Sequence, residues 1–248
     1  MTLITPETKL ADAIHSNYMI IPIVNRFGIR LGFGDKIIDE ICTEHGVDAD
    51  FFVAILNTFT FSSYFSKSRL KSFSISQWVD YLRRTHVYYR EVELPIIEIH
   101  LKKLTDSIKD GDGKSLELVS RFFFDYKAEL TAHLSREDSI TFPYIEELLQ
   151  VQHSPNAKDE YAKLATKYSI KEFESEHDNV DEKLFDLKNI LIKYISDSYD
   201  QSLCNAVIFE LTRLENDLKD HTRLENEILV PLAEELEQSI KQDTVAEK

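Results

Sequence analysis

Apolar residues between positions 76 and 240 recur at alternating steps of three and four, the spacing that buries one face of a long helix. Four stripes of this kind follow one another along the chain. Their members are Val79, Leu82, His86, Tyr89, Ile97, Leu101 and Leu104; Leu116, Val119, Phe123, Tyr126, Leu130, His133, Glu137, Ile140 and Tyr144; Ile170, Phe173, His177, Val180, Leu184, Leu187 and Leu191; and Val207, Leu211, Leu214, Leu218, His221, Glu225, Ile228 and Leu232. The pattern predicts an all-α protein with an up-down four-helix bundle over residues 76–240.

Each stripe is interrupted by a histidine, and two of the stripes carry a glutamate four residues later. The interrupting residues are His86, His133, Glu137, His177, His221 and Glu225. Subtracting the numbers of successive histidines gives 47, 44 and 44 residues, about the length of one long helix and its return loop. We therefore expect all six side chains to meet in one layer of the bundle. A buried carboxylate costs several kcal/mol unless it is compensated, and a metal ion would compensate it.

Six nitrogen and oxygen ligands exceed the four of a tetrahedral zinc site and suit two metal ions that share carboxylates. Imidazole with bridging carboxylate is typical of non-haem iron or manganese, whereas calcium and magnesium prefer oxygen ligands alone. On this hypothesis the four histidines are terminal metal ligands, and Glu137 and Glu225 are bridges. The spacing leaves open which histidines share an ion. Coordination positions that stay open would bind a small ligand such as dioxygen or nitric oxide.

A metal-free interpretation of the same residues is also open. A single histidine in an apolar stripe is usually a hydrogen-bonded core residue, and a buried hydrogen bond between histidine and glutamate would explain each pair separately. The recurrence on four helices at matching heights, with the glutamate at the same offset in two of them, favours the metal site.

Composition narrows the classes of partner and compartment. The chain has 248 residues, of which 43% are hydrophobic, and a formal net charge of −15. This charge argues against binding to nucleic acid or to an anionic membrane, because both need a basic surface. No secretory signal is visible, and no apolar run approaches the roughly 20 residues of a membrane span. Cys42 and Cys204 have no disulfide or metal-site spacing, so we expect a cytoplasmic protein.

The N-terminal part of the sequence lacks the long stripes of the predicted bundle. Short helical patterns broken by glycines predict a small helical N-terminal domain over residues 1–58. Residues 59–75 are rich in serine and aromatic residues, which predicts a linker whose aromatic side chains dock on a surface. The polar residues 241–248 are expected to form a disordered tail.

Four segments around the interrupting residues carry a resemblance to a known family. They are HLSREDSITFP around His133 and Glu137, HTRLENEILVP around His221 and Glu225, ESEHD around His177, and LRRTHVYYREVELP around His86. They resemble the hemerythrin-like HHE cation-binding family and, more narrowly, the di-iron proteins of iron–sulfur cluster repair. The resemblance implies two iron ions bridged by carboxylates and an oxo group, with manganese or zinc as substitutes. The family often has a double histidine in its first helix, whereas here Val87 follows His86.

The N-terminal segment LADAIHSNYMIIPIVNRFGIRLGFGDKIIDEICTEHGVD resembles the small domain that precedes the bundle in the repair proteins. That domain usually carries a cysteine pair just after its Phe-Gly-Ile turn. The corresponding positions here are Leu31, Gly32, Phe33 and Gly34. The thiol chemistry of that pair is therefore not expected in this chain.

The resemblance implies a protein that repairs iron–sulfur centres, or delivers iron to them, under nitrosative or oxidative stress. Iron–sulfur proteins would be its partners, reduction of nitric oxide would be a related activity, and a homodimer is compatible with this role. The first alternative is a hemerythrin-like protein that binds or senses dioxygen or nitric oxide. The second is an acidic structural bundle that holds no metal.

Overall fold

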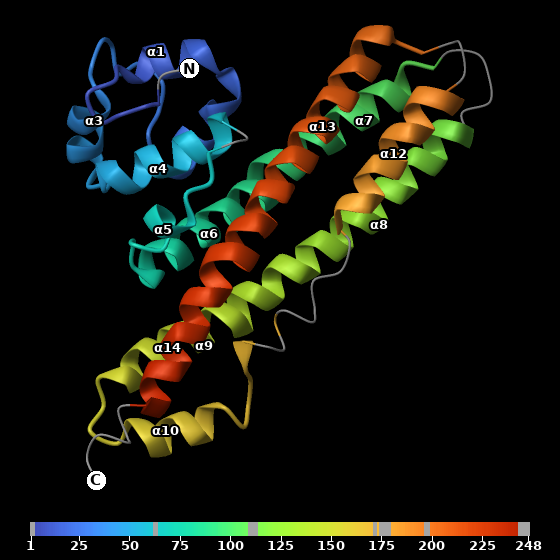
Figure 1. Ribbon diagram of the computed structural model, residues 1–248. Coiled ribbons are helices and arrows are strands. Elements are labelled where there is room, and N and C mark those ends of the chain that lie inside the picture. The colour runs from blue at the N-terminus through green and yellow to red at the C-terminus, as the bar shows by residue number, and fades with distance from the viewer. Residues whose placement is uncertain are drawn as a thin grey trace. The chain divides into compact units, whose positions relative to one another are not determined.

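The computed structural model describes residues 3–61, 64–108, 114–170, 173, 180–195 and 199–242 (Figure 1). Over these ranges the chain is helical and contains no β-strand, apart from an isolated bridge between Lys9 and Ile37. The predicted all-α class is therefore confirmed. The chain divides into two compact units, Met1–Thr85 and His86–Lys248.

The first unit contains short helices. They are α1 (Leu10–Ser16), η1 (Tyr18–Ile20), α2 (Ile21–Arg26), α3 (Ile38–His45), α4 (Ala49–Thr60), α5 (Lys67–Leu70) and the first part of α6 (Ile75–Tyr88). Helix α3 ends at Gly46, whose φ of 63° lies in the left-handed region that glycine adopts without strain. Helix α4 begins after Asp48, whose side chain accepts a hydrogen bond from the backbone N–H of Phe51.

Aromatic side chains build the core of the first unit. The ring of Phe51 lies edge-on to the rings of Trp78 and Phe73, with centroids 5.0 and 5.1 Å away. The indole N–H of Trp78 donates a hydrogen bond to the carbonyl of Leu70 at 3.1 Å. Phe73 belongs to the segment that was predicted as a docked linker, and its ring does pack on this core.

The second unit contains the long helices. After the end of α6 these are η2 (Tyr89–Glu93), α7 (Leu94–Asp106), α8 (Lys114–Arg136), η3 (Glu137–Thr141), α9 (Phe142–Gln152), α10 (Ala157–Leu164), α12 (Val180–Tyr194), α13 (Gln201–Leu224), η4 (Glu225–Leu229) and α14 (Val230–Gln242). Helix α13 packs against α7 and α12, and α8 packs against the same two helices, so the four form a closed ring (Figure 1). Beyond it, α9 packs against α14 and α10.

Apart from Val79 and Leu82, which lie in the first unit, the four predicted stripes supply the core of this unit, with two corrections. Ile140 is 43% exposed, whereas Thr141 is buried. Likewise Leu232 is only half-buried, and Ala233 takes the buried position instead. In both helices the buried register has moved by one residue, because a five-residue turn begins at the glutamate of each stripe.

The third predicted helix is interrupted. Helix α10 ends at Leu164, residues 165–169 are not helical, and Ile170 and Phe173 are helical again; helix α12 spans Val180–Tyr194. Ile170 and Phe173, which lie between them, are buried as their stripe predicts. None of the helices in the described part of the chain is both long and apolar enough to cross a membrane.

Candidate metal centre

Three π turns, η2, η3 and η4, lie where the long helices carry the candidate ligands. In each turn the residue before a proline donates its backbone N–H to the carbonyl five residues earlier. These bonds join Leu94 to Tyr89, Phe142 to Glu137, and Val230 to Glu225. The prolines that follow are Pro95, Pro143 and Pro231. Since proline has no N–H and its ring crowds the preceding turn, the wider π turn accommodates it without ending the helix.

Four of the predicted side chains converge in the second unit. His86 comes from α6, Glu137 opens η3, His221 comes from the last turn of α13, and Glu225 opens η4. One ligand atom from each of the four lies within 4.8 Å of the corresponding atoms of the others. All four residues are buried. We call these four residues the His/Glu cluster.

The ring nitrogens of the cluster point at one another and at the carboxylates. The Nε2 atoms of His86 and His221 are 3.3 Å apart. His86 Nε2 lies 3.2 Å from Glu137 Oε2, and His221 Nε2 lies 3.0 Å from Glu225 Oε1. Nitrogens and carboxylate oxygens thus surround one small volume, as the donors of a metal site do.

His133 lies beside the cluster, close to the Glu137 oxygen that faces away from His86. Its Nε2 is 3.1 Å from Glu137 Oε1, while Glu137 Oε2 faces His86. The side chain of His133 is 18% exposed, compared with 0–3% for the four cluster residues. Glu137 therefore stands between two histidines with one oxygen toward each. The remaining predicted ligand, His177, lies outside the described residues.

Glu137 shows that these donors fit a metal ion. Neither of its buried oxygens has a hydrogen-bond partner among the described residues, although histidine nitrogens lie at 3.1 and 3.2 Å. The nitrogens are close but not aligned for hydrogen bonding. A buried carboxylate without hydrogen bonds is costly, and a cation between the donors removes that cost. Imidazole and carboxylate together form the donor set that non-haem iron or manganese takes.

Asp138 contacts the His/Glu cluster, which the sequence pattern did not reveal. Its Oδ1 lies 2.9 Å from His86 Nδ1, and its Oδ2 lies 2.7 Å from a guanidinium nitrogen of Arg90. Phe142 stacks on the His86 ring with centroids 5.3 Å apart, and Tyr89 lies edge-on to the His221 ring. The only sequence signal for Asp138 was its place directly after Glu137. In a regular helix the residue after a buried stripe position points away from the stripe.

The electrostatics of the layer follow from burial and charge. Burial lowers the pKa of His86, but the hydrogen bond with Asp138 and the interactions with Glu137 and Glu225 outweigh it and raise this pKa to about 9. Burial and the neighbouring Glu225 act to raise the pKa of Glu137, yet the contacts with His133 and His86 lower it overall. In the metal-free layer both directions favour the charged forms, in which the imidazolium of His86 compensates the carboxylates in place of a metal ion.

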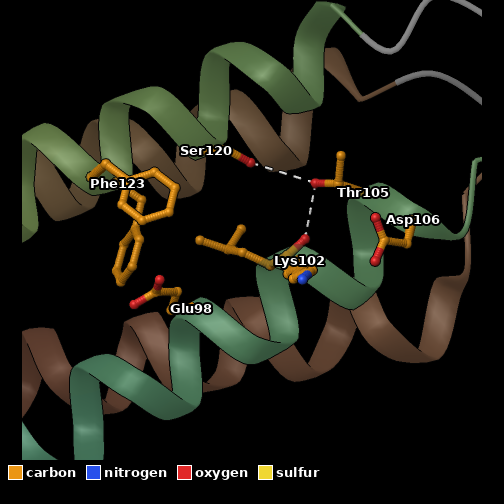
Figure 2. Close-up of a pocket in the computed structure, with 8 residues that line it drawn as sticks. Glu98, Lys102, Thr105, Asp106, Ser120 and Phe123 are labelled. Carbon is orange, nitrogen blue, oxygen red and sulfur yellow. Dashed lines mark hydrogen bonds between the residues drawn. The ribbon is translucent and has the colours of Figure 1, made fainter.

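A separate hollow of about 260 Å³ lies between α7 and α8 (Figure 2). It is lined by Glu98, Leu101, Lys102, Thr105, Asp106, Ser120, Phe123 and Phe124. The hydroxyl of Thr105 donates to the carbonyl of Leu101 at 2.9 Å and lies 3.4 Å from the Ser120 hydroxyl. The lining contains none of the six predicted ligands, so this hollow is distinct from the His/Glu cluster.

The Cys42 thiol of the N-terminal unit is buried in a protonated state. Cys42 on α3 is buried, and burial, with Asp39 and Asp48 nearby, raises its pKa to about 12. A thiol with such a pKa carries almost no thiolate at neutral pH and is a poor nucleophile or ligand.

The fold and the cluster together define a helical bundle with a buried group of histidines and carboxylates that could hold a metal ion. The family model of the hemerythrin HHE cation binding domain matches residues 79–233, more than half of the chain and a range that includes all six predicted ligands. The chain belongs to this family. A search of the curated proteins found no match.

Proposed function

We propose that this chain is a non-haem di-iron protein that repairs iron–sulfur centres, or delivers iron to them, after nitrosative or oxidative damage. The proposed ligands are His86, His133, Glu137, His177, His221 and Glu225. The observation that carries the metal centre is Glu137, a buried carboxylate that stands between two histidines and has no hydrogen-bond partner in the part of the chain that the structure describes. The role in repair rests on the resemblance of both the bundle motifs and the N-terminal segment to the repair proteins.

The contacts support a division of the ligands between two ions. His86 and His221 face each other at 3.3 Å, so we assign them to one ion. His133 approaches the other oxygen of Glu137, so we assign it to the second ion, with His177 as its proposed companion. Glu137 and Glu225 are the proposed bridges.

The surroundings of the two sets of ligands differ in a way that suits iron delivery. The side chains of His86 and His221 are 0% and 3% exposed, whereas that of His133 is 18% exposed. Small ligands and chelating groups would therefore approach from the His133 side, while the His86 side excludes water. Bound iron supplies redox chemistry and open positions for nitric oxide or dioxygen. The protein holds the donors in place, keeps both carboxylates dry, and leaves one histidine within reach.

The metal assignment is tested by anaerobic metal quantification with iron spectroscopy on protein purified under iron-replete conditions. We expect about two iron ions per chain and a loss of iron in a His133→Ala variant. The exposed His153, replaced by alanine, serves as the matched control and should retain full iron content. Less than one metal ion per chain in the parent protein would contradict the di-iron centre, and bound manganese or zinc in place of iron would contradict the choice of metal.

The repair role is tested by adding iron-loaded protein to an iron–sulfur enzyme that nitric oxide has inactivated. We expect recovery of activity with the loaded protein and much less with the metal-free protein. Equal recovery with both forms would refute the repair role but leave the metal centre standing.

The near-zero exposure of the His/Glu cluster also favours a second candidate, the binding or sensing of a diatomic gas, because only a very small ligand reaches such a site. A reversible optical band on exposure to dioxygen or nitric oxide, stable over many cycles, would support this alternative.

A further inference from the structure

The two histidines of the His/Glu cluster are held differently on their outer sides. His86 Nδ1 lies 2.9 Å from Asp138 Oδ1. His221 Nδ1 is buried and has no hydrogen-bond partner among the described residues. Both rings direct Nε2 into the cluster, so the outer nitrogen is the point at which their environments diverge.

Asp138 is itself fixed by a second contact. Its Oδ2 lies 2.7 Å from a guanidinium nitrogen of Arg90, and the side chains of Asp138 and Arg90 are 25% and 26% exposed. Arg90 lies four residues after His86, in η2, and Asp138 lies in η3. Asp138 therefore links two residues of the same helical segment, since His86 lies in α6 and Arg90 lies in η2, which follows α6 directly.

We propose that Asp138 and Arg90 form a positioning pair that keeps the proton of His86 on Nδ1 and aims its Nε2 lone pair at the metal ion. The inference rests on the proposed metal centre. A carboxylate on the outer nitrogen fixes the tautomer and the ring orientation and makes the other nitrogen a better donor, an effect typically worth about 10–100-fold in metal affinity. Arg90 holds the carboxylate in line. His221 has no such support among the described residues, so we expect the two ligands to contribute unequally to binding.

The geometry distinguishes this role from an ordinary surface ion pair. A pair of partly exposed charges such as Arg90 and Asp138 contributes little to stability by itself, about 0–1 kcal/mol. The other oxygen of Asp138, however, reaches a fully buried ring that Phe142 stacks against on one face. The ring is therefore fixed in plane by stacking and in rotation by the Asp138 contact.

The first experiment uses the metal-free protein and does not depend on the di-iron assignment. In the parent protein, NMR should show a slowly exchanging, hydrogen-bonded Nδ1–H proton on His86. An Asp138→Ala variant should lose this resonance. Persistence of the resonance in that variant would overturn the positioning role, even if the protein were later found to hold another metal.

The second experiment measures iron(II) affinity by competition with a chelator. We expect about 10–100-fold weaker binding for Asp138→Ala. Arg90→Gln should have a smaller effect, and Asp138→Asn, which keeps the shape and one acceptor oxygen, should lie between the parent and the alanine variant. Asp125→Asn, an exposed carboxylate on α8, is the matched control and should bind as the parent does. If Asp138→Ala does not fold, the asparagine variant decides. Unchanged affinity and unchanged iron spectra in Asp138→Asn would refute the proposal.

Discussion

The two units of this molecule differ in how one buried polar side chain of each is hydrogen-bonded. In the first unit, Asn57 on α4 is 2% exposed. Its oxygen accepts the backbone N–H of Ile4 at 2.9 Å, and its amide donates to the carbonyls of Ile4 and Val53 at 2.8 and 3.0 Å. In the second unit, Glu137 is equally buried, but its oxygens lack hydrogen bonds within the described chain. A satisfied polar group completes a fold, whereas an unsatisfied one indicates a ligand.

Metal removal should have the largest effect and should be confined to the second unit. Binding free energy is part of folding free energy in such sites, so stripping the metal should cost the bundle several kcal/mol. Hydrogen exchange followed by mass spectrometry should show faster exchange in peptides from η3 and η4 and unchanged exchange in peptides from α4. Equally faster exchange in peptides from both units would contradict the prediction that the metal stabilises only the second unit.

A Glu225→Leu substitution should lower the free energy of unfolding more in the metal-loaded protein than in the metal-free protein. In the loaded protein the variant should lose metal and stability together, because a bridging ligand is gone. In the metal-free protein it should also be destabilising, but by less, because the buried His221 ring loses the carboxylate that lies 3.0 Å from its Nε2. Urea unfolding of both forms measures this. A variant that is destabilised equally with and without metal would show that Glu225 has a structural role only.

An Asn57→Ala substitution should have a smaller effect, independent of metal. The backbone N–H and carbonyl of Ile4 would lose their partner, at a cost of about 1–3 kcal/mol. Asn25→Ala, at an exposed position on α2, is the control and should change stability little. Thermal unfolding with and without metal should give the same difference. A metal-dependent cost would indicate that the polar groups of the two units are energetically linked.

Much of the fold was predictable because it follows from periodicity. The stripes that predicted four helices do form the core, and His86, Glu137, His221 and Glu225 do lie in one layer. Their role as ligands stays a prediction, as does that of His177.

The residues that periodicity placed wrongly, or did not predict, lie in the π turns or after them. Counting steps of three and four predicted that Ile140 and Leu232 are buried. An extra residue in each π turn moves the buried position to Thr141 and Ala233 instead. The prolines at a fixed distance after Glu137 and Glu225 were the available signal. Asp138 was missed for a related reason, because helical counting directs the residue after a seam glutamate away from the seam.

The extra residue in η4 also fixes the direction in which α14 faces. One residue of an α-helix turns the chain by about 100°. Removing a single residue from η4 would therefore swing Ala233 and the rest of the buried side of α14 away from α9, its neighbour in the bundle. The length of this short segment therefore keeps α14 packed against α9.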